Sequence, residues 1–396
     1  MNFDIAIVGG GLVGASLAAS LKDSGLTLVL IESQSSLMGD DLPAVGVVAA
    51  TDKWDSRIYA ISPGSRAFLE DSGAWALLDN SRVEPVTEMR VFGDTGAELD
   101  FSAYQMGVSE LACILENNAL QQALWKVLRQ QDNLTLINPA RCASLKVGAD
   151  EAELTLKDGR SINAKLIVGA DGRDSWLRNQ SGISAAPVDY QQHGVVANFT
   201  TAIPHRGIAH QWFQADGILA LLPLPGNRVS MVWSVSPEKS AELLALTHAE
   251  LCAKVAGAAQ NMLGELQVMT PPAAFPLRLL VLPQITAPRV ALIGDAAHNM
   301  HPLAGQGVNT GFRDARELSR VLMARGAQSD SGDAQLLRRY ERKRKEDIYS
   351  MQATTYGLKH LFNNEVSLLR SVRNVGLNVT DRIVSLKKLL MQHALN

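Results

Sequence analysis

The chain has 396 residues, of which 46% are hydrophobic and 19% charged, a composition that is ordinary for a soluble globular protein. This length predicts two or three structural units, and no run of about 18 uncharged apolar residues indicates a membrane-spanning helix. Three widely separated cysteines give no metal-spaced pair and no disulfide framework, and the net charge of −3 is uneven, because residues 334–396 carry twelve Lys or Arg against five Asp or Glu.

The first predicted elements form a nucleotide-binding turn. Residues 4–8 (DIAIV) have the pattern of a buried parallel strand, and residues 12–21 predict a helix rich in small side chains. Between them, Gly9 allows a tight turn, Gly11 lets the backbone approach a pyrophosphate, and Gly14 lets helix and strand pack closely. The apolar start lacks a basic segment, so we expect no signal peptide and a cytoplasmic protein.

An acidic residue completes this first motif. Residues 27–31 (TLVLI) predict the next strand, and Glu32 at its end is placed to accept a hydrogen bond from a ribose hydroxyl. An ordinary glycine-rich turn is the alternative interpretation. A dinucleotide site is favoured, because the strand, the glycines, the helix, the second strand and the acid all follow in the expected order and spacing.

The middle of the chain predicts a helix, a β-hairpin and a second glycine–acid motif. Residues 117–131 carry apolar side chains on one helical face, and residues 152–157 and 161–168 alternate apolar and polar residues around an Asp-Gly turn. The second hairpin strand leads directly into residues 169–174 (GADGRD), which contain Asp171.

From about residue 187 to 275 the pattern changes to short strands between Pro and Gly turns. Strands are predicted at residues 195–201, 211–214, 218–222 and 229–235, and one helix at residues 237–255. The pattern predicts an antiparallel sheet inserted into the nucleotide-binding fold, to which residues 76–105 also contribute. Candidate pocket-wall residues are apolar side chains of these strands, although ordinary sheet core is the commoner role of any one of them: Trp212, Phe213, Leu219, Leu221, Leu222 and Trp233.

The third motif, residues 294–309 (GDAAHNMHPLAGQGVN), follows a predicted strand at residues 289–293. Asp295 at the strand end can hold a ribityl hydroxyl, and Gly305 and Gly307 permit close approach to a flat ring. Asn309 begins the next predicted helix, whose N-terminal dipole would face that ring. Asp295, His298 and His301 resemble a metal triad, but Pro302 and the glycines predict a loop, so we expect no metal site.

Residues 294–309 resemble the ubiquinone-biosynthesis flavin hydroxylases, which are class A aromatic monooxygenases with the para-hydroxybenzoate hydroxylase fold. Residues 55–62 (DSRIYAIS), 171–172 and 217–224 (GILALLPL) resemble the same family, and the resemblance extends to about residue 350. It implies an α/β fold in which a Rossmann-like FAD-binding domain carries an inserted antiparallel β-sheet substrate domain and C-terminal helices. We assign residues 1–75, 106–185 and 276–330 to the discontinuous FAD-binding domain, residues 76–105 and 186–275 to the substrate domain, and residues 331–396 to a C-terminal helical region.

The resemblance also implies roles for single residues. It places Gly9, Gly11, Gly14 and Glu32 on the ADP half of FAD, Arg57 near the pyrophosphate, Asp171 in the shared nucleotide region and Asp295 on the ribityl chain. It places Pro302, Gly305, Gly307, Val308 and Asn309 beside the isoalloxazine, with Pro302, Gly305 and Gly307 as the catalytic loop. From the residues alone, Arg57 is also explained as a surface salt-bridge residue and Asp171 as the cap of a turn. No side chain is identified as the proton acceptor.

The implied activity is hydroxylation of the aromatic ring of a polyprenylated phenol, in which NAD(P)H visits transiently to reduce FAD and O2 adds to give a flavin C4a-hydroperoxide. Two alternatives stay open: another flavin oxidoreductase on the same scaffold, such as an epoxidase or reductase, and a non-catalytic FAD-binding scaffold subunit of a biosynthetic complex. The ring position, the tail length, the preferred nicotinamide and the oligomeric state are left open.

The expected partners follow from the apolar substrate. A prenylated phenol partitions into membrane, so the basic segment 334–396, whose last part predicts an amphipathic helix, is a candidate peripheral contact with the inner face of the membrane. Packing of that helix on the protein's own core or in a homo-oligomer is the alternative. A ubiquinone-biosynthesis complex is a further expected partner, and a nucleic acid is not.

Overall fold

The computed structural model describes residues 1–35, 54–93, 96–185, 188–299, 306–326 and 329–362. A first sheet has the strand order β18-β19-β11-β1-β2-β8, and the β9–β10 hairpin continues it from β11. β1 pairs in parallel with both β2 and β11, as the apolar run after the N-terminus predicts. The strands of this sheet are β1 (Asn2–Val8), β2 (Leu28–Ile31), β8 (Leu134–Ile137), β9 (Cys142–Val147), β10 (Ala152–Leu156), β11 (Ser161–Gly169), β18 (Thr286–Ala287) and β19 (Val290–Leu292).

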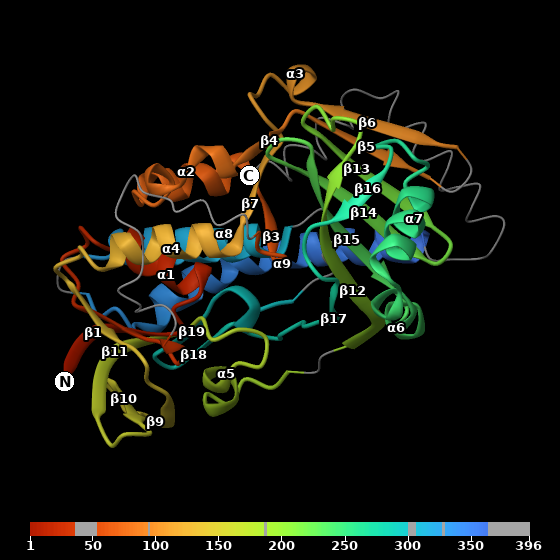
Figure 1. Ribbon diagram of the computed structural model, residues 1–396. Coiled ribbons are helices and arrows are strands. Elements are labelled where there is room, and N and C mark those ends of the chain that lie inside the picture. Colours follow the sequence, from red (N-terminus) through yellow and green to blue (C-terminus); the bar gives the residue numbers. More distant parts are fainter. Residues whose placement is uncertain (36–53, 94–95, 186–187, 300–305, 327–328, 363–396) are drawn as a thin grey trace.

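Helices bury the central strands of this sheet. Ile5, Ala6 and Ile7 of β1 have no exposed surface, because both faces of the strand are covered. Helix α1 (Leu12–Ser20) contacts both α4 (Asn117–Leu128) and α8 (Gln306–Met323), and the three run together along the sheet in Figure 1. Seven of the nine residues of α1 are buried, which explains its small side chains.

A second sheet, mainly antiparallel, has the order β16-β12-β15-β14-β13-β5-β6, with β17 also pairing with β12. This is the predicted inserted sheet, and residues 84–102 do contribute two of its strands. The fold class predicted from the sequence is thus confirmed. The strands are β5 (Glu88–Phe92), β6 (Glu98–Ser102), β12 (Val188–Thr201), β13 (Ile208–Gln214), β14 (Gly217–Leu224), β15 (Arg228–Val235), β16 (Leu266–Val268) and β17 (Ala273–Leu279).

The single helix predicted at residues 237–255 is wrong, because two helices cover this sheet. Helix α6 (Pro237–Ala245) ends before Leu246, and α7 (His248–Ala258) begins anew. Thr247 starts the second helix with a capping box: its hydroxyl accepts from Glu250 N at 3.3 Å, and the Glu250 carboxylate accepts from Thr247 N at 2.8 Å. The threonine and the glutamate three residues later were the sequence signal for this break.

The remaining elements connect the two sheets and extend the chain. A small sheet of order β3-β7-β4 lies between them in Figure 1, and α9 crosses the middle of the view. Among the described residues, no helix has both the length and the apolar character needed to cross a bilayer. The predicted amphipathic helix near residues 379–390 lies outside them. These elements are β3 (Ile58–Ile61), β4 (Glu84–Val86), β7 (Ala112–Glu116), α2 (Pro63–Asp71), α3 (Ala103–Met106), α5 (Trp176–Gln180), α9 (Ala334–Phe362) and the 3-10 turns Trp75–Leu77, Asn80–Arg82 and Gly294–Ala296.

Candidate functional site

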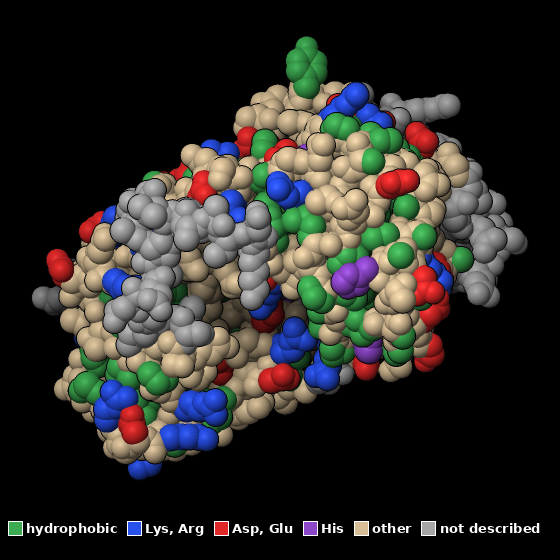
Figure 2. Space-filling view, in the orientation of Figure 1, with side chains coloured by type: hydrophobic (Ala, Val, Ile, Leu, Met, Phe, Trp, Pro, Cys, Tyr) green, Lys and Arg blue, Asp and Glu red, His purple; other side chains and the backbone are tan. Residues whose placement is uncertain are grey.

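A cavity of about 820 Å³ runs from the glycine turn after β1 to the face of the second sheet. Figure 2 shows the surface hollowed between the two halves of the molecule. In the close-up, Asp295 and Val308 lie on one side of the cavity, and Val196, Val232 and Ser230 lie on the other. The cavity therefore joins the sequence motifs of both sheets in a single space.

The three glycines of the first motif have the geometry that their spacing predicts. Gly9 has a φ of +105°, and a Cβ there would collide with the carbonyl oxygen of Ala170. A Cβ on Gly14 would collide with the carbonyl oxygen of Gly9, so helix α1 can approach the turn only because residue 14 has no side chain. Gly11 lines the cavity with no described atom within 4 Å of its Cβ position, and no side chain caps the start of α1. The free N–H groups of α1 thus face an open, anion-binding space.

Glu32 lies in this part of the cavity and also holds the turn. One carboxylate oxygen accepts from Gly10 N at 2.7 Å, and the other accepts from Gln34 N at 2.7 Å. A carboxylate offers about four lone-pair positions, so Glu32 can still accept from a ribose hydroxyl.

Helix α4 contributes two residues to the turn that the sequence reasoning missed. Gln121 Nε2 and Trp125 Nε1 both donate to the carbonyl oxygen of Gly10, at 2.7 and 2.9 Å. Gln121 also lines the cavity. Its amide stands on the otherwise apolar buried face of the helix, and that polar interruption was the available signal.

Arg57 lines the middle of the cavity, next to Tyr59. Its guanidinium lies over the Tyr59 ring, 5.5 Å from the ring centroid, and its backbone N–H donates to Asp55. Burial raises the pKa of the Tyr59 hydroxyl above its usual value, and the nearby Asp295 carboxylate acts in the same direction. Arg57 thus offers a cation to an anionic group in the cavity, and the neighbouring phenol stays neutral.

Asp171 does not line the cavity, although its neighbours Ala170, Gly172 and Arg173 do. Its carboxylate accepts from Ser175 Oγ at 2.5 Å and from Leu177 N at 3.0 Å. Asp171 therefore stabilises the start of α5, which is the turn-capping role that the sequence left as the alternative.

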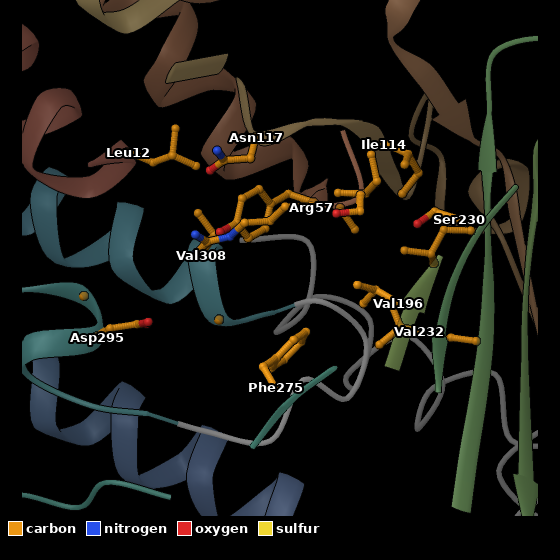
Figure 3. Close-up of a pocket in the computed structure, with 18 of the residues that line it drawn as sticks. Leu12, Arg57, Ile114, Asn117, Val196, Ser230, Val232, Phe275, Asp295 and Val308 are labelled. Carbon is orange, nitrogen blue, oxygen red and sulfur yellow. The ribbon is translucent and has the colours of Figure 1, made fainter. Parts of the chain in front are cut away.

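Asp295 lies on the 3-10 turn after β19, and its carboxylate points into the cavity (Figure 3). The turn is held by Asp314 of α8, which has no exposed surface: its carboxylate accepts from Gly294 N at 2.8 Å, contacts His298 Nε2 at 2.6 Å and accepts from Arg344 Nε of α9 at 2.6 Å. His298 is thus part of a buried ionic network. His301 of the triad considered above lies outside the described residues.

The start of α8 forms the end of the cavity opposite the second sheet. Gly307 and Val308 line it, and no described atom lies within 4 Å of the position a Cβ on Gly307 would occupy. The helix begins at Gln306, so its N-terminal dipole faces the cavity. Asn309 does not line the cavity: its amide accepts from Ser62 N at 2.9 Å and donates to Ala60 O at 2.8 Å, which ties α8 to β3. Pro302 and Gly305 lie outside the described residues.

The face of the second sheet that lines the cavity is largely apolar. Val196, Ala220, Leu222 and Val232 line it, each half-buried, and the sheet also contributes buried polar residues to the lining, namely His210, Gln211, Ser230 and Ser234. Phe275 of β17 closes the lower side in Figure 3.

Of the six predicted wall residues, only Leu222 lines this cavity. Trp212, Leu219, Leu221 and Trp233 point to the other face, where they form a core with Leu243, Leu251 and Val255 of α6 and α7. Phe213 packs in a small cluster with Val91 and Ile218.

The arrangement fits a dinucleotide cofactor with a flat ring. The bare backbone at Gly11 and Gly307 leaves room for a pyrophosphate and for a ring, and two helix N-termini offer a positive field at these two points. Glu32, Arg57 and Asp295 line the space between and beside them with groups that bind hydroxyls and phosphate. The apolar sheet face beyond α8 suits an apolar ring substrate.

Comparison with known proteins agrees with this geometry. The family model described as FAD binding domain matches residues 2–354. The 3-demethoxyubiquinol 3-hydroxylase of Escherichia coli is 36% identical and the ubiquinone hydroxylase UbiL of Rhodospirillum rubrum 35% identical, each over 99% of this chain and over 98% and 89% of their own lengths. The crystal structure of pqsL, a probable FAD-dependent monooxygenase from Pseudomonas aeruginosa, superposes with a TM-score of 0.78 at 22% identity, over 95% of this chain and 99% of that one, and shows the same fold.

Proposed function

The chain belongs to the FAD-binding-domain family that includes the ubiquinone-biosynthesis hydroxylases, and from this premise we propose that it hydroxylates the aromatic ring of a polyprenylated phenol, using FAD, NAD(P)H and O2. One observation carries the proposal: a single cavity joins the dinucleotide turn, Asp295, the start of α8 and an apolar sheet face. A hydroxylase needs this continuity, because the substrate ring must meet the reactive part of the cofactor away from bulk water.

The cofactor-binding roles are assigned residue by residue. The open N-terminus of α1 at Gly11 would hold the pyrophosphate together with Arg57, Glu32 would accept from the ribose, and Asp295 from the ribityl chain. Gly9 and Gly14 act indirectly, because they allow the turn and the helix to approach each other. When bound, FAD supplies the redox chemistry, accepting reducing equivalents from NAD(P)H and activating O2.

The protein's own part in the reaction is positioning. Gly307 and Val308 present the dipole of α8 to the ring site, where it would favour negative charge on a bound flavin ring. Val196, Ala220, Leu222 and Val232 form a wall that orients an aromatic ring and excludes water. We propose that Pro302 and Gly305 also belong to the loop beside the ring. We further propose that the FAD-binding unit and the substrate unit predicted from the sequence are the functional units of the protein.

An apolar substrate must reach the enzyme from a membrane or from a partner protein. We propose a cytoplasmic protein that touches the inner face of the membrane through its C-terminal region, because Arg338, Arg339, Arg342 and Lys343 are exposed along α9. The alternative is that this region binds another ubiquinone-biosynthesis protein or a second copy of the chain. Co-sedimentation with anionic vesicles, compared for the wild-type chain and a full-length variant in which Arg338, Arg339, Arg342 and Lys343 are replaced by Glu, tests the membrane contact. Equal sedimentation would contradict it.

Turnover of the purified, FAD-loaded protein tests the main proposal. A short prenylated phenol should accelerate NAD(P)H oxidation and yield a hydroxylated product in proportion to the NAD(P)H consumed. A plain reductase would oxidise NAD(P)H without a hydroxylated product, an epoxidase would modify the prenyl double bond, and an idle scaffold subunit would do neither. The Val232→Phe variant, which fills the proposed ring site, is the matched control and should lose the acceleration.

A further inference from the structure

Ser230 lies in the wall of the cavity and finds no hydrogen-bond partner in the part of the chain that the structure describes. It belongs to β15, is 1% exposed and lines the cavity, and its Oγ has no hydrogen-bond partner among the described residues. In Figure 3 Ser230 lies on the sheet side of the cavity. A buried hydroxyl without a partner costs about 1–3 kcal/mol, so a ligand oxygen that satisfies it gains binding free energy.

Ser230 pairs with one polar and one apolar residue in the sheet. Asn198 of β12 and Leu222 of β14 are its register partners on the two sides. The amide nitrogen of Asn198 donates to Asp55 O at 2.8 Å, while its Oδ1 is buried without a partner among the described residues. The next pairs along the strands, Val196, Val232 and Ala220, are apolar.

We propose that Ser230 is a specificity-determining residue, whose hydroxyl binds the phenolic oxygen of the substrate ring. A serine hydroxyl both donates and accepts, so it can accept from the phenol O–H or donate to its oxygen. Asn198, its cross-strand partner, does not line the cavity, so the proposed contact is made by Ser230 alone. With one ring oxygen held at Ser230 and the apolar Val196, Ala220 and Val232 beside it, the ring is restricted in the orientation it presents to the start of α8, and that orientation selects the carbon that is hydroxylated.

This assignment rests on the proposed function, and binding measurements test it without turnover. The FAD-loaded protein is titrated with a short prenylated phenol and with the same molecule lacking the ring hydroxyl, and the flavin fluorescence gives each Kd. We compare the Kd of the ligand without the hydroxyl divided by the Kd of the phenol. This ratio should fall about 5- to 10-fold in Ser230→Ala, as expected for one lost neutral hydrogen bond. Ser230→Thr, which keeps the hydroxyl, should retain the wild-type ratio.

The matched control is Ser240→Ala on α6. Ser240 is also 1% exposed with an unpartnered Oγ, but it does not line the cavity, so its removal should leave the ratio unchanged. Equal weakening of both ligands in Ser230→Ala, or no change, would overturn the assignment. A wild-type protein that binds neither ligand would instead refute the proposed function.

Discussion

Asp314→Asn tests whether the buried ionic network holds the Asp295 turn. The carboxylate is fully buried and contacts three groups, Gly294 N, His298 Nε2 and Arg344 Nε. Burial acts to raise its pKa, but His298 and Arg344 outweigh burial and hold the pKa of Asp314 below its usual value. Asp314 is therefore charged at neutral pH, and the stability it contributes is lost only as the pH falls through this lowered pKa.

The structure sets the expected magnitude. Removing one partner of a buried ion pair costs about 3–5 kcal/mol, because the other charge is left uncompensated. Arg344 keeps a second partner, since its Nη1 donates to Asp347 at 2.6 Å, so we expect about 3 kcal/mol, the lower end of that range. FAD binding should weaken as well, because the turn that carries Asp295 loses its anchor at Gly294.

Urea denaturation and FAD titration measure the two effects. The control is Asp158→Asn in the turn between β10 and β11, where the side chains of Arg160 and Asp158 are 45% and 47% exposed; such a surface pair contributes little to the free energy of unfolding. An Asp314→Asn variant that unfolds at the wild-type urea concentration and keeps wild-type FAD affinity would refute the reasoning.

Three further predictions follow from the described contacts. Burial lowers the pKa of His210 from 6.5 to about 4, so the unfolded chain binds a proton that the folded chain excludes, and stability should fall by up to about 3 kcal/mol as the pH drops through this window; denaturation of His210→Gln should show a flatter pH profile, whereas exposed His248→Gln should not. Gln121→Leu removes one of two donors to Gly10 O and should weaken FAD binding about 2- to 10-fold, a loss that fluorescence titration measures and whose absence would count against a role for α4. Val232→Phe should abolish binding of a prenylated phenol with little change in the unfolding midpoint, while Trp233→Ala should cost about 3–5 kcal/mol in urea denaturation, and the reverse pattern would show that the sheet faces are misassigned.

The glycine turn was predictable because its physics is local. Gly9 needs a positive φ, a Cβ on Gly14 would collide with the carbonyl oxygen of Gly9, and Gly11 leaves the start of α1 open, so the spacing indicates their roles. The supporting bonds from Gln121 and Trp125 to Gly10 span more than a hundred residues; a polar Gln121 on an apolar face signals a buried partner but does not identify it as Gly10.

The residues of the substrate wall could not be predicted from the sequence. Successive side chains of a strand point to opposite faces of the sheet, but the sequence does not tell which face lines the cavity. In β14, Ala220 is half-buried while its neighbours Leu219 and Leu221 are buried, and the bulky Trp212, Leu219 and Trp233 fill the face that α6 and α7 cover. Large apolar side chains belong in a packed core, while a ligand needs space, so the smaller Ala220 and Val232 line the cavity. Choosing pocket residues by size favours the wrong face.

Incorporation of labelled oxygen tests the central claim most directly. FAD-loaded protein, NAD(P)H and a short prenylated phenol are incubated under ¹⁸O2, and the product is analysed by mass spectrometry. The proposed function predicts a hydroxylated ring that carries one ¹⁸O atom, with product formed in proportion to the NAD(P)H consumed. NAD(P)H oxidation that yields only hydrogen peroxide, or a product whose new oxygen comes from water or lies on the prenyl chain, would contradict it.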